Sequence, residues 1–263
     1  MDISGSKILV TGATGGLGQA IAAALGDRGA KLVLTGRRTE VLMPLAAPYG
    51  AEVIGVDLAD PRAVARLAEE CGSVDAVVAN AGLPGSGRLE SYAVEEIDRL
   101  LDVNLRAPIM LAHALAPAMV ARGRGAFVFM SSLSGKSAAP GTALYSATKY
   151  GLRGFALSLR ADLHGSGVGV SVVNPGFIRD AGMFAESGAE LPAGVGTKTP
   201  ADVAAAVVRA LEKNPAELDV APLPLRAGAA LSGLAPGFAE TITRRLGGHE
   251  IADRISAGQA DKR

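Results

Sequence analysis

The sequence predicts an α/β fold, a single doubly wound parallel sheet of about seven strands with helices on both faces. The first observation is that short apolar runs alternate with longer segments of helical periodicity. The second is that these runs are β-branched and apolar on both faces, as central parallel strands are when helices cover both sides. The third is that glycines and polar residues follow one run after another, at the edge where such sheets bind ligands.

Each element follows from its local pattern. Strands are expected at residues 7–12, 31–37, 51–58, 74–82, 125–132, 168–176 and 217–222. Helices are expected at residues 16–29, 60–70, 94–122 (one long helix or two), 143–167 and 200–214. Asp60 is expected to cap the second helix, because Pro61 suits its first position. The pattern weakens from about residue 222, where Pro222, Pro224 and Pro236 interrupt it.

Length and composition suit one domain, 1–263, and exclude several classes of partner. Among 263 residues, 26 Lys and Arg balance 26 Asp and Glu, so no charge surplus argues for nucleic acid. No run of about 20 apolar residues predicts a membrane span, and the polar N-terminus lacks a signal-peptide pattern. The single Cys71 suits a reducing compartment, so we expect a cytoplasmic protein. The three histidines lack metal-ligand spacing, so no metal site is expected.

A glycine-rich turn, "TGATGGLG", joins the first strand to the first helix, with glycines at 12, 15, 16 and 18. Glycine permits tight turns and close approach of backbone to a phosphate. The free N–H groups of the following helix favour an anion. The turn is either an ordinary connection or a nucleotide-binding loop, and its place in a βαβ unit favours the second reading and a Rossmann-type fold.

The second strand ends with Gly36 and Arg37, where a carboxylate would accept the ribose hydroxyls of NAD. A small neutral residue before a guanidinium instead leaves room for a 2′-phosphate and attracts it. We therefore expect NADP(H) to be favoured over NAD(H), although Arg37 can also be read as a solvated surface residue. After the third strand, Asp57 and Leu58 are placed to bracket an adenine, although Asp57 can equally be read as a loop residue.

The segment "YSATK" places Tyr145 and Lys149 one turn apart on a helix. Such a pair is often only a packed ring beside a solvated charge. Read functionally, it is a proton donor, because a nearby cation lowers the phenol pKa from about 10. A Tyr with a lowered pKa would serve as a general acid or base near neutral pH.

With these motifs in register, the chain resembles the short-chain dehydrogenase/reductase family over about residues 5–220, followed by a C-terminal extension at about 221–263. The resemblance is carried, in order, by "TGATGGLG", "NAG" at 80–82, "DVNL" at 102–105, Ser132, "YSATK" and "NPG" at 174–176. It implies an oxidoreductase that reduces a carbonyl or oxidises a secondary alcohol with a nicotinamide cofactor. It also implies a homodimer or homotetramer that pairs through the helices around 95–121 and 145–163.

The resemblance also implies a role for each matching residue. Tyr145 would be the general acid or base, Ser132 would hydrogen-bond the substrate oxygen, and Lys149 would hold the nicotinamide ribose and lower the Tyr pKa. Asn104 would help to position a water in a proton relay. The implied cofactor contacts are Gly12, Thr14, Gly16, Leu17, Gly18, Arg37, Asp57, Leu58, Asn80, Ala81, Gly82, Tyr145, Lys149, Pro175, Gly176 and Ile178.

One position departs from the family pattern: Asp180 stands where a Thr often contacts the nicotinamide carboxamide. Asp180 can be read as an acceptor for that amide or as a helix cap. The glycine-rich stretch 182–199 reads as a flap over substrate or as a plain loop, with Met183, Phe184 and Leu191 indicating an apolar pocket. Two alternatives remain open, the same chemistry with NAD(H) and a dinucleotide-sensing protein with little turnover.

Overall fold

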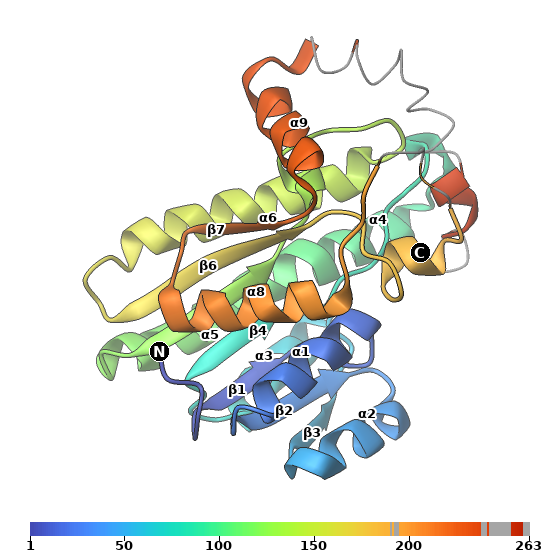
Figure 1. Ribbon diagram of the computed structural model, residues 1–263. Coiled ribbons are helices and arrows are strands. Elements are labelled where there is room, and N and C mark those ends of the chain that lie inside the picture. The colour runs from blue at the N-terminus through green and yellow to red at the C-terminus, as the bar shows by residue number, and fades with distance from the viewer. Residues whose placement is uncertain (190, 192–194, 238–240, 242–253, 260–263) are drawn as a thin grey trace.

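The computed structural model describes residues 1–189, 191, 195–237, 241 and 254–259. One parallel sheet crosses this part of the chain in the order β3-β2-β1-β4-β5-β6-β7 (Figure 1). Its strands are β1 (Lys7–Val10), β2 (Lys31–Gly36), β3 (Glu52–Gly55), β4 (Ala76–Ala79), β5 (Gly125–Met130), β6 (Val168–Pro175) and β7 (Glu217–Val220). The predicted doubly wound parallel sheet with seven strands is confirmed.

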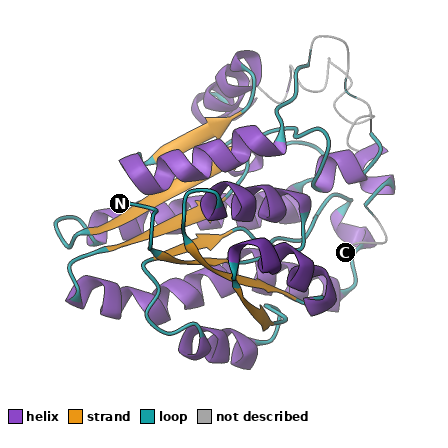
Figure 2. Ribbon diagram, turned by 60° about the horizontal axis from the view of Figure 1, so that its bottom comes forward, coloured by secondary structure: helices purple, strands orange, loops and turns teal. Residues whose placement is uncertain are grey.

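Helices cover both faces of the sheet (Figure 2). One face carries α1 (Gly16–Gly26), α2 (Thr39–Ala46) and α8 (Pro200–Lys213). The other face carries α3 (Pro61–Glu70), α5 (Ala107–Ala121) and α6 (Ala143–Asp162). The helix α4 (Val94–Leu101) continues into α5 through a π-helical turn, η3 (Asp102–Arg106). The short α7 (Met183–Glu186) and α9 (Leu223–Leu234) lie beyond these layers.

Two apolar cores lie between the sheet and its helices. On the first face Ile8 and Val10 of β1 pack with Ile21 and Leu25 of α1 and Val207 of α8, all buried. On the second face the strands pack against side chains of α3, α5 and α6, among them Leu67, Leu111, Met119, Leu152 and Phe129. The strands, which are apolar on both faces, therefore pack against helices on both faces, as the sequence pattern predicts.

The chain order reverses at the centre of the sheet. From β1 the chain winds outward to β3, and it then returns to β4 and winds the other way to β7. The connections after β1 and β4 therefore diverge and leave a crevice beyond the carboxyl ends of these two strands. This crevice is where the predicted ligand-binding residues meet.

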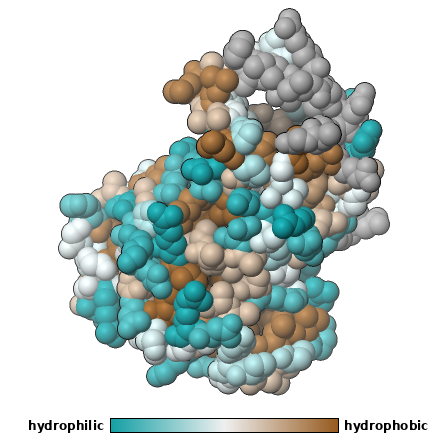
Figure 3. All heavy atoms as spheres, viewed as in Figure 1, coloured by the Kyte–Doolittle hydropathy of each residue, from teal (hydrophilic) through white to brown (hydrophobic). Residues whose placement is uncertain are grey.

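The helix start at Asp60 is confirmed, since its side chain accepts from Arg62 N–H at 2.8 Å and Pro61 holds the first position. Three helices were not predicted, namely α2, α7 and α9. α2 contains Pro44, and α9 begins at Leu223, with Pro222 as its N-cap and Pro224 in its first turn, where a missing N–H costs nothing. Pro222 and Pro224, which seemed to interrupt the pattern, thus lie at the start of α9. Apolar residues of α9 are exposed at the surface (Figure 3).

The continuous helical stretch Val94–Ala121 is long and apolar enough, by length and composition alone, to cross a membrane. Half of its most apolar window is buried inside the fold. Leu111, Leu115 and Met119 from this stretch pack in the core beneath the sheet. Burial of this kind is what a central helix of an α/β domain requires, and it explains the apolar composition.

Candidate active site

A cavity of about 1000 Å³ lies over the carboxyl edge of the sheet. Every residue predicted for cofactor binding or catalysis lines it, with one exception, Asn104. Residues that the sequence did not single out also contribute, notably Arg99, Phe177, Ala181, Ile255 and Gln259. Within the described residues, no cluster of His, Cys, Asp and Glu is arranged to hold a metal ion.

The glycine loop is shaped by close backbone contacts. Gly12 has a φ of +65°, and a Cβ there would lie 2.7 Å from Ala81 Cα. A Cβ on Gly16 or Gly18 would likewise collide with neighbouring atoms, whereas one on Gly15 would meet only Gly12 O at 3.6 Å. No side chain caps α1 at Gly15, so the N–H groups of its first turn remain for an anionic ligand. This cradle fits the diphosphate of a dinucleotide.

Asn80 and Ala81 fasten the glycine loop to the end of β4. The backbone N–H groups of Asn80 and Ala81 donate to Thr11 Oγ1 at 3.1 and 3.0 Å. The Asn80 side chain donates to the carbonyls of Thr11 and Gly12 at 3.0 and 3.2 Å. Asn80 therefore fixes the shape of the loop, and its amide nitrogen is already engaged there.

The end of β2 offers a positive charge. Arg37 is exposed, lines the cavity and forms no ion pair with any described residue. Gly36 packs closely, because a Cβ there would lie 3.0 Å from Thr14 Cγ2. The guanidinium is therefore available to a phosphate, while little room is left at Gly36 for a larger side chain.

Asp57, expected beside the adenine, is held by a residue that the sequence did not reveal. Its carboxylate accepts from Arg99 Nη2 of α4 at 3.1 Å and from Ala59 N–H at 3.0 Å. Burial works to raise the pKa of Asp57, but these hydrogen bonds outweigh it and lower the pKa. Leu58 is buried next to it. Arg99 lies on α4, far in the sequence from Asp57, so no local motif could predict that the two residues meet.

Ser132, Tyr145 and Lys149 come together beyond β5. The Tyr145 hydroxyl and the Ser132 hydroxyl are hydrogen-bonded. Ser132 Oγ also accepts from Ser134 N–H at 3.1 Å and lies 3.4 Å from Pro175 O, to which it donates. Lys149 is 3% exposed, and its Nζ donates to Met130 O at 2.9 Å. Two half-buried hydroxyls and one buried ammonium thus share a corner of the cavity.

The expectation that Lys149 lowers the pKa of Tyr145 is wrong in this structure. Burial raises the pKa of Tyr145 to about 12, and the hydrogen bond to Ser132 offsets only part of that rise. The Lys149 ammonium is directed at the Met130 carbonyl and lies 5.5 Å from the centroid of the Tyr145 ring. Burial also lowers the pKa of Lys149 to about 8. Desolvation is thus the largest cause of both pKa shifts.

Asn104 holds the backbone of the segment that follows β4. It lies in the π-helical turn η3 and is 1% exposed. Its Oδ1 accepts from Leu83 N–H at 2.7 Å, and its Nδ2 donates to Leu83 O at 3.0 Å. The Asn104 side chain thus pairs with the segment that follows β4, and Gly82 passes between it and Lys149 Nζ. π-Helical turns occur often at functional sites.

The end of β6 supplies Pro175, Gly176 and Ile178 to the cavity. Neither reading of Asp180 is borne out. Asp180 has a φ of +72°, its side chain is 65% exposed beside Arg179, and it does not line the cavity. The N-cap of α7 is Gly182. Met183 and Phe184 line the cavity as expected, but Leu191 does not, and residues 190 and 192–194 lie outside the described part of the chain.

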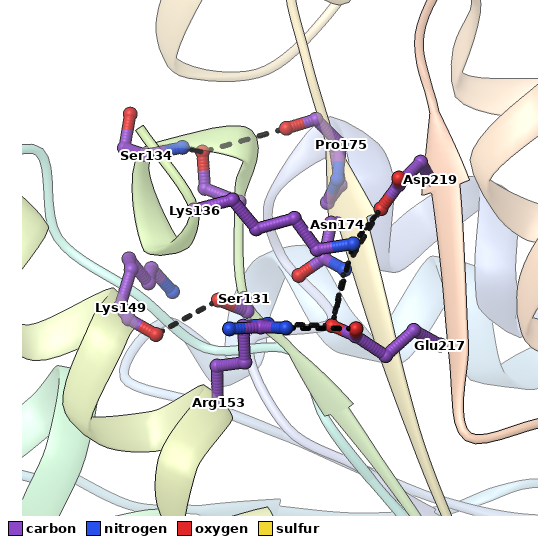
Figure 4. Close-up of polar contacts among 10 residues, drawn as sticks. Ser131, Ser134, Lys136, Lys149, Arg153, Asn174, Pro175, Glu217 and Asp219 are labelled. Atoms are coloured by element: carbon purple, nitrogen blue, oxygen red, sulfur yellow. Dashed lines mark hydrogen bonds and ion pairs between the residues drawn. The ribbon is translucent and has the colours of Figure 1, made fainter. Parts of the chain in front are cut away.

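A half-buried group of charged residues contacts the loop that follows Ser132 (Figure 4). Lys136 Nζ lies 2.7 Å from Asp219 Oδ1, and Arg153 binds Glu217 through two bonds of 2.6 and 2.9 Å. Asn174 donates to both carboxylates, at 3.2 and 3.0 Å. Burial works to raise the pKa of Glu217, but Arg153 and Lys136 together lower it to about 2. The group joins the Ser132 loop, α6, β6 and β7.

The comparisons with known sequences agree on one family. A family model described as short chain dehydrogenase matches residues 6–192. The "Ketoacyl reductase HetN" of Nostoc sp. is 34% identical over 227 residues, covering 83% of this chain and 79% of that protein. The "NADP-dependent 3-hydroxy acid dehydrogenase YdfG" of Salmonella typhi is 36% identical over 178 residues, covering 65% of this chain and 72% of that protein.

Solved structures show the same architecture. A short-chain dehydrogenase from Streptomyces avermitilis superposes with a TM-score of 0.78 at 31% identity, over 92% of this chain and 97% of that chain. A metagenomic short-chain oxidoreductase in complex with NADP superposes with a TM-score of 0.71 at 34% identity, over 84% and 98% of the two chains. Both similarities extend over most of the sheet and its helices.

Proposed function

This chain belongs to the short-chain dehydrogenase/reductase family and is an oxidoreductase of CH–OH and C=O groups, and we propose that it works on small carbonyl compounds with NADP(H) through Ser132, Tyr145 and Lys149. The observation that carries the proposal is the hydrogen-bonded pair of Ser132 and Tyr145 hydroxyls in the cavity, beside a buried ammonium. No other described part of the cavity combines a proton donor with a second hydroxyl in this way.

Each group has a distinct task in carbonyl reduction. NADP(H), when bound over the glycine loop, supplies the hydride. Tyr145 donates its proton to the carbonyl oxygen, and Ser132 donates a hydrogen bond that stabilises the charge developing there. A phenol whose pKa is about 12 is protonated at neutral pH, so Tyr145 carries the proton that the carbonyl oxygen takes up. Lys149 holds the ribose hydroxyls and supplies a positive charge next to the reacting centre.

The choice of NADP(H) rests on the end of β2. Arg37 is an exposed guanidinium with no ion-pair partner in the described structure, and no carboxylate stands beside it at Gly36. The planar guanidinium of an arginine binds a phosphate better than it binds a ribose hydroxyl. Several structural neighbours are complexes with NADP or NADPH, which supports the same assignment by analogy.

We also propose a homo-oligomer that pairs through α5 and α6. Met110 and Val120 of α5 and Tyr150 of α6 are exposed between 36% and 40%. A second copy would cover these apolar groups. Light scattering at micromolar concentration should give at least twice the mass of one chain, and a monomer would contradict the assignment.

The function is tested by following nicotinamide absorbance with a panel of ketones and secondary alcohols and with both cofactors. We expect turnover of at least one apolar ketone, with NADPH preferred over NADH by about tenfold or more in kcat/KM. A protein that binds NADPH but turns over no member of the panel would instead support the dinucleotide-sensing alternative. Tighter binding of NADH would reverse the cofactor assignment.

A further inference from the structure

The C-terminal segment 254–259 spans the outer side of the cavity. In Figure 1 it is the red segment beside the short α7. Ser256 Oγ donates to Ser86 O at 3.3 Å, on the connection that follows β4. Gln259 Nε2 donates to Met183 O at 3.0 Å, on α7, which follows β6. The segment therefore joins the two sides of the cavity opening, which come from opposite halves of the chain.

The turn before Gln259 is fixed by a close contact. Gly258 packs so tightly on the backbone of Ser187 that a Cβ there would overlap the Ser187 carbonyl. Gly258 N–H donates to Arg254 O at 3.2 Å, and Gln259 N–H donates to Ser256 O at the same distance. Because the backbone is held on both sides, the side chains of Ile255 and Gln259 are directed into defined places, and both line the cavity.

Gln259 carries an unused acceptor. The residue is only 4% exposed, and its Oε1 is buried without a hydrogen-bond partner among the described residues. Leaving a buried amide oxygen unpaired costs about 1–3 kcal/mol. Buried polar groups in folded proteins nearly always have partners, so an exception in a cavity wall calls for an explanation. Gln259 lines the cavity, so a shift of its amide would bring Oε1 to a donor on a molecule that enters there.

The rest of this end of the cavity is largely apolar, with Ser86 and Glu186 as its other polar members. Phe177 and Phe184 pack with ring centroids 4.9 Å apart, and both line the cavity together with Met183 and Ile255. Ser132 and Tyr145 stand in the same cavity, on the sheet side. Gln259 thus brings an amide to a largely apolar wall, and it lies far in the sequence from the reacting hydroxyls.

We propose that Gln259 is a specificity-determining residue, whose amide oxygen accepts a hydrogen bond from the far end of the substrate. The substrate class is an apolar ketone, or the matching secondary alcohol, that carries a hydroxyl or amide N–H remote from the reacting carbon. This proposal rests on the proposed function for the reacting end and adds the recognition of the other end. The C-terminal segment then acts as a substrate wall built from residues outside the common family core.

The test compares methyl ketones of increasing chain length that end either in a methyl or in a hydroxyl group. In the wild-type enzyme, the hydroxyl compound of one length should exceed its methyl partner about tenfold in kcat/KM, the value of one good hydrogen bond. In Gln259→Met, which keeps the length of the side chain and removes the amide, this preference should fall to within about twofold. Ile255→Val, one turn earlier in the same wall, is the matched control and should keep the preference.

A binding measurement separates this proposal from the proposed function. The affinity of the same ketones for the enzyme–NADPH complex, followed by NADPH fluorescence, needs no turnover and should show the same hydroxyl preference. Loss of all turnover with that preference intact would overturn the reductase assignment alone. Absence of ketone binding at every length, equal binding of both series, or a preference that survives in Gln259→Met would overturn the role of Gln259.

Discussion

The two ends of the cavity are built in different ways. The cofactor end is made of backbone: a glycine loop after β1 locked to the end of β4 by Thr11 and Asn80. The substrate end is made of side chains from segments far apart in the sequence, such as Tyr145 of α6, Met183 of α7 and Gln259 near the C-terminus. The first end can be recognised in a short motif, and the second exists only in the folded chain.

This difference teaches where each kind of specificity resides. A backbone cradle accepts any dinucleotide diphosphate, so the choice between the cofactors is left to one exposed side chain, Arg37. A wall of side chains from distant segments can vary residue by residue without disturbing the fold. A substitution at the cofactor end should therefore either abolish cofactor affinity or leave it unchanged, depending on whether a new side chain fits against the backbone. Substitutions at the substrate end should change substrate preference by intermediate amounts.

The largest effect on cofactor binding is expected from Gly12→Ala. The new Cβ would lie 2.7 Å from the Ala81 backbone at a φ of +65°, so the loop must move. Strain of about 1–2 kcal/mol from the left-handed backbone adds to the displacement, and NADPH affinity should fall by about a hundredfold or more. Gly15→Ala is the matched control, since its Cβ would meet only Gly12 O, at an ordinary contact distance of 3.6 Å, and it should bind within about twofold of wild type. Equal losses in the two variants would refute the backbone account.

A smaller effect is expected from Arg37→Ala. Removing a charge-assisted bond to the 2′-phosphate should lower NADPH affinity by about ten- to thirtyfold and leave NADH affinity unchanged, as titrations of both cofactors would show. The change Gly36→Asp, combined with Arg37→Ala, should shift preference toward NADH. Because a Cβ at Gly36 lies 3.0 Å from Thr14 Cγ2, this shift should be larger when Thr14→Ser is added. Parallel losses for both cofactors in Arg37→Ala would contradict the phosphate contact.

A moderate effect is expected from pH, because NADPH affinity should depend on the charge of Lys149. Since burial lowers the pKa of Lys149 to about 8, its ammonium is present below that pH and is lost above it. NADPH affinity should therefore fall by about fivefold between pH 7 and pH 9, within the value of one charged hydrogen bond. Lys149→Met should bind more weakly than wild type at pH 7 and show a flat profile. A wild-type profile as flat as that of Lys149→Met would show that this ammonium does not hold the cofactor.

The smallest effect on ligand binding is expected from Glu217→Gln, which acts on stability. The Glu217 pKa is depressed from 4.5 to about 2, so its contribution is present above about pH 4.5 and lost as pH falls toward 2. Glu217→Gln should lower the unfolding free energy by about 2 kcal/mol at pH 7, with a difference that shrinks in acid. Glu52→Gln breaks the exposed pair with Lys7 and should change stability by less than about 0.5 kcal/mol. Equal effects of the two variants in urea unfolding would argue against a bracing role.

Much of the cofactor end was predictable from the sequence, because its requirements are local. A glycine at a positive φ, a helix start and a strand end are all written within a few residues. The predicted contacts from Gly12 to Gly18 and from Asn80 to Gly82 line the cavity for this reason. The alternation of apolar runs predicted the sheet equally well, since burial on both faces leaves a clear pattern.

What the sequence did not predict depends on long-range packing. Arg99 reaches Asp57 from another helix, and Gln259 arrives from the end of the chain. The direction of the Tyr145 shift was wrong because a four-residue spacing indicates proximity to Lys149 but says nothing of how deeply both groups are buried. The helix α9 was missed because prolines were read as breaks rather than as a helix start.

The central claim is that the Tyr145 hydroxyl delivers the proton, and a single-turnover experiment with Tyr145→Phe tests it most directly. Tyr150→Phe, on the exposed side of the same helix, is the matched control. Hydride transfer from bound NADPH to a ketone should slow by about a thousandfold in Tyr145→Phe, with cofactor affinity unchanged within about twofold, and should keep its wild-type rate in Tyr150→Phe. A folded Tyr145→Phe protein that binds NADPH and reduces the ketone at the wild-type rate would contradict the account.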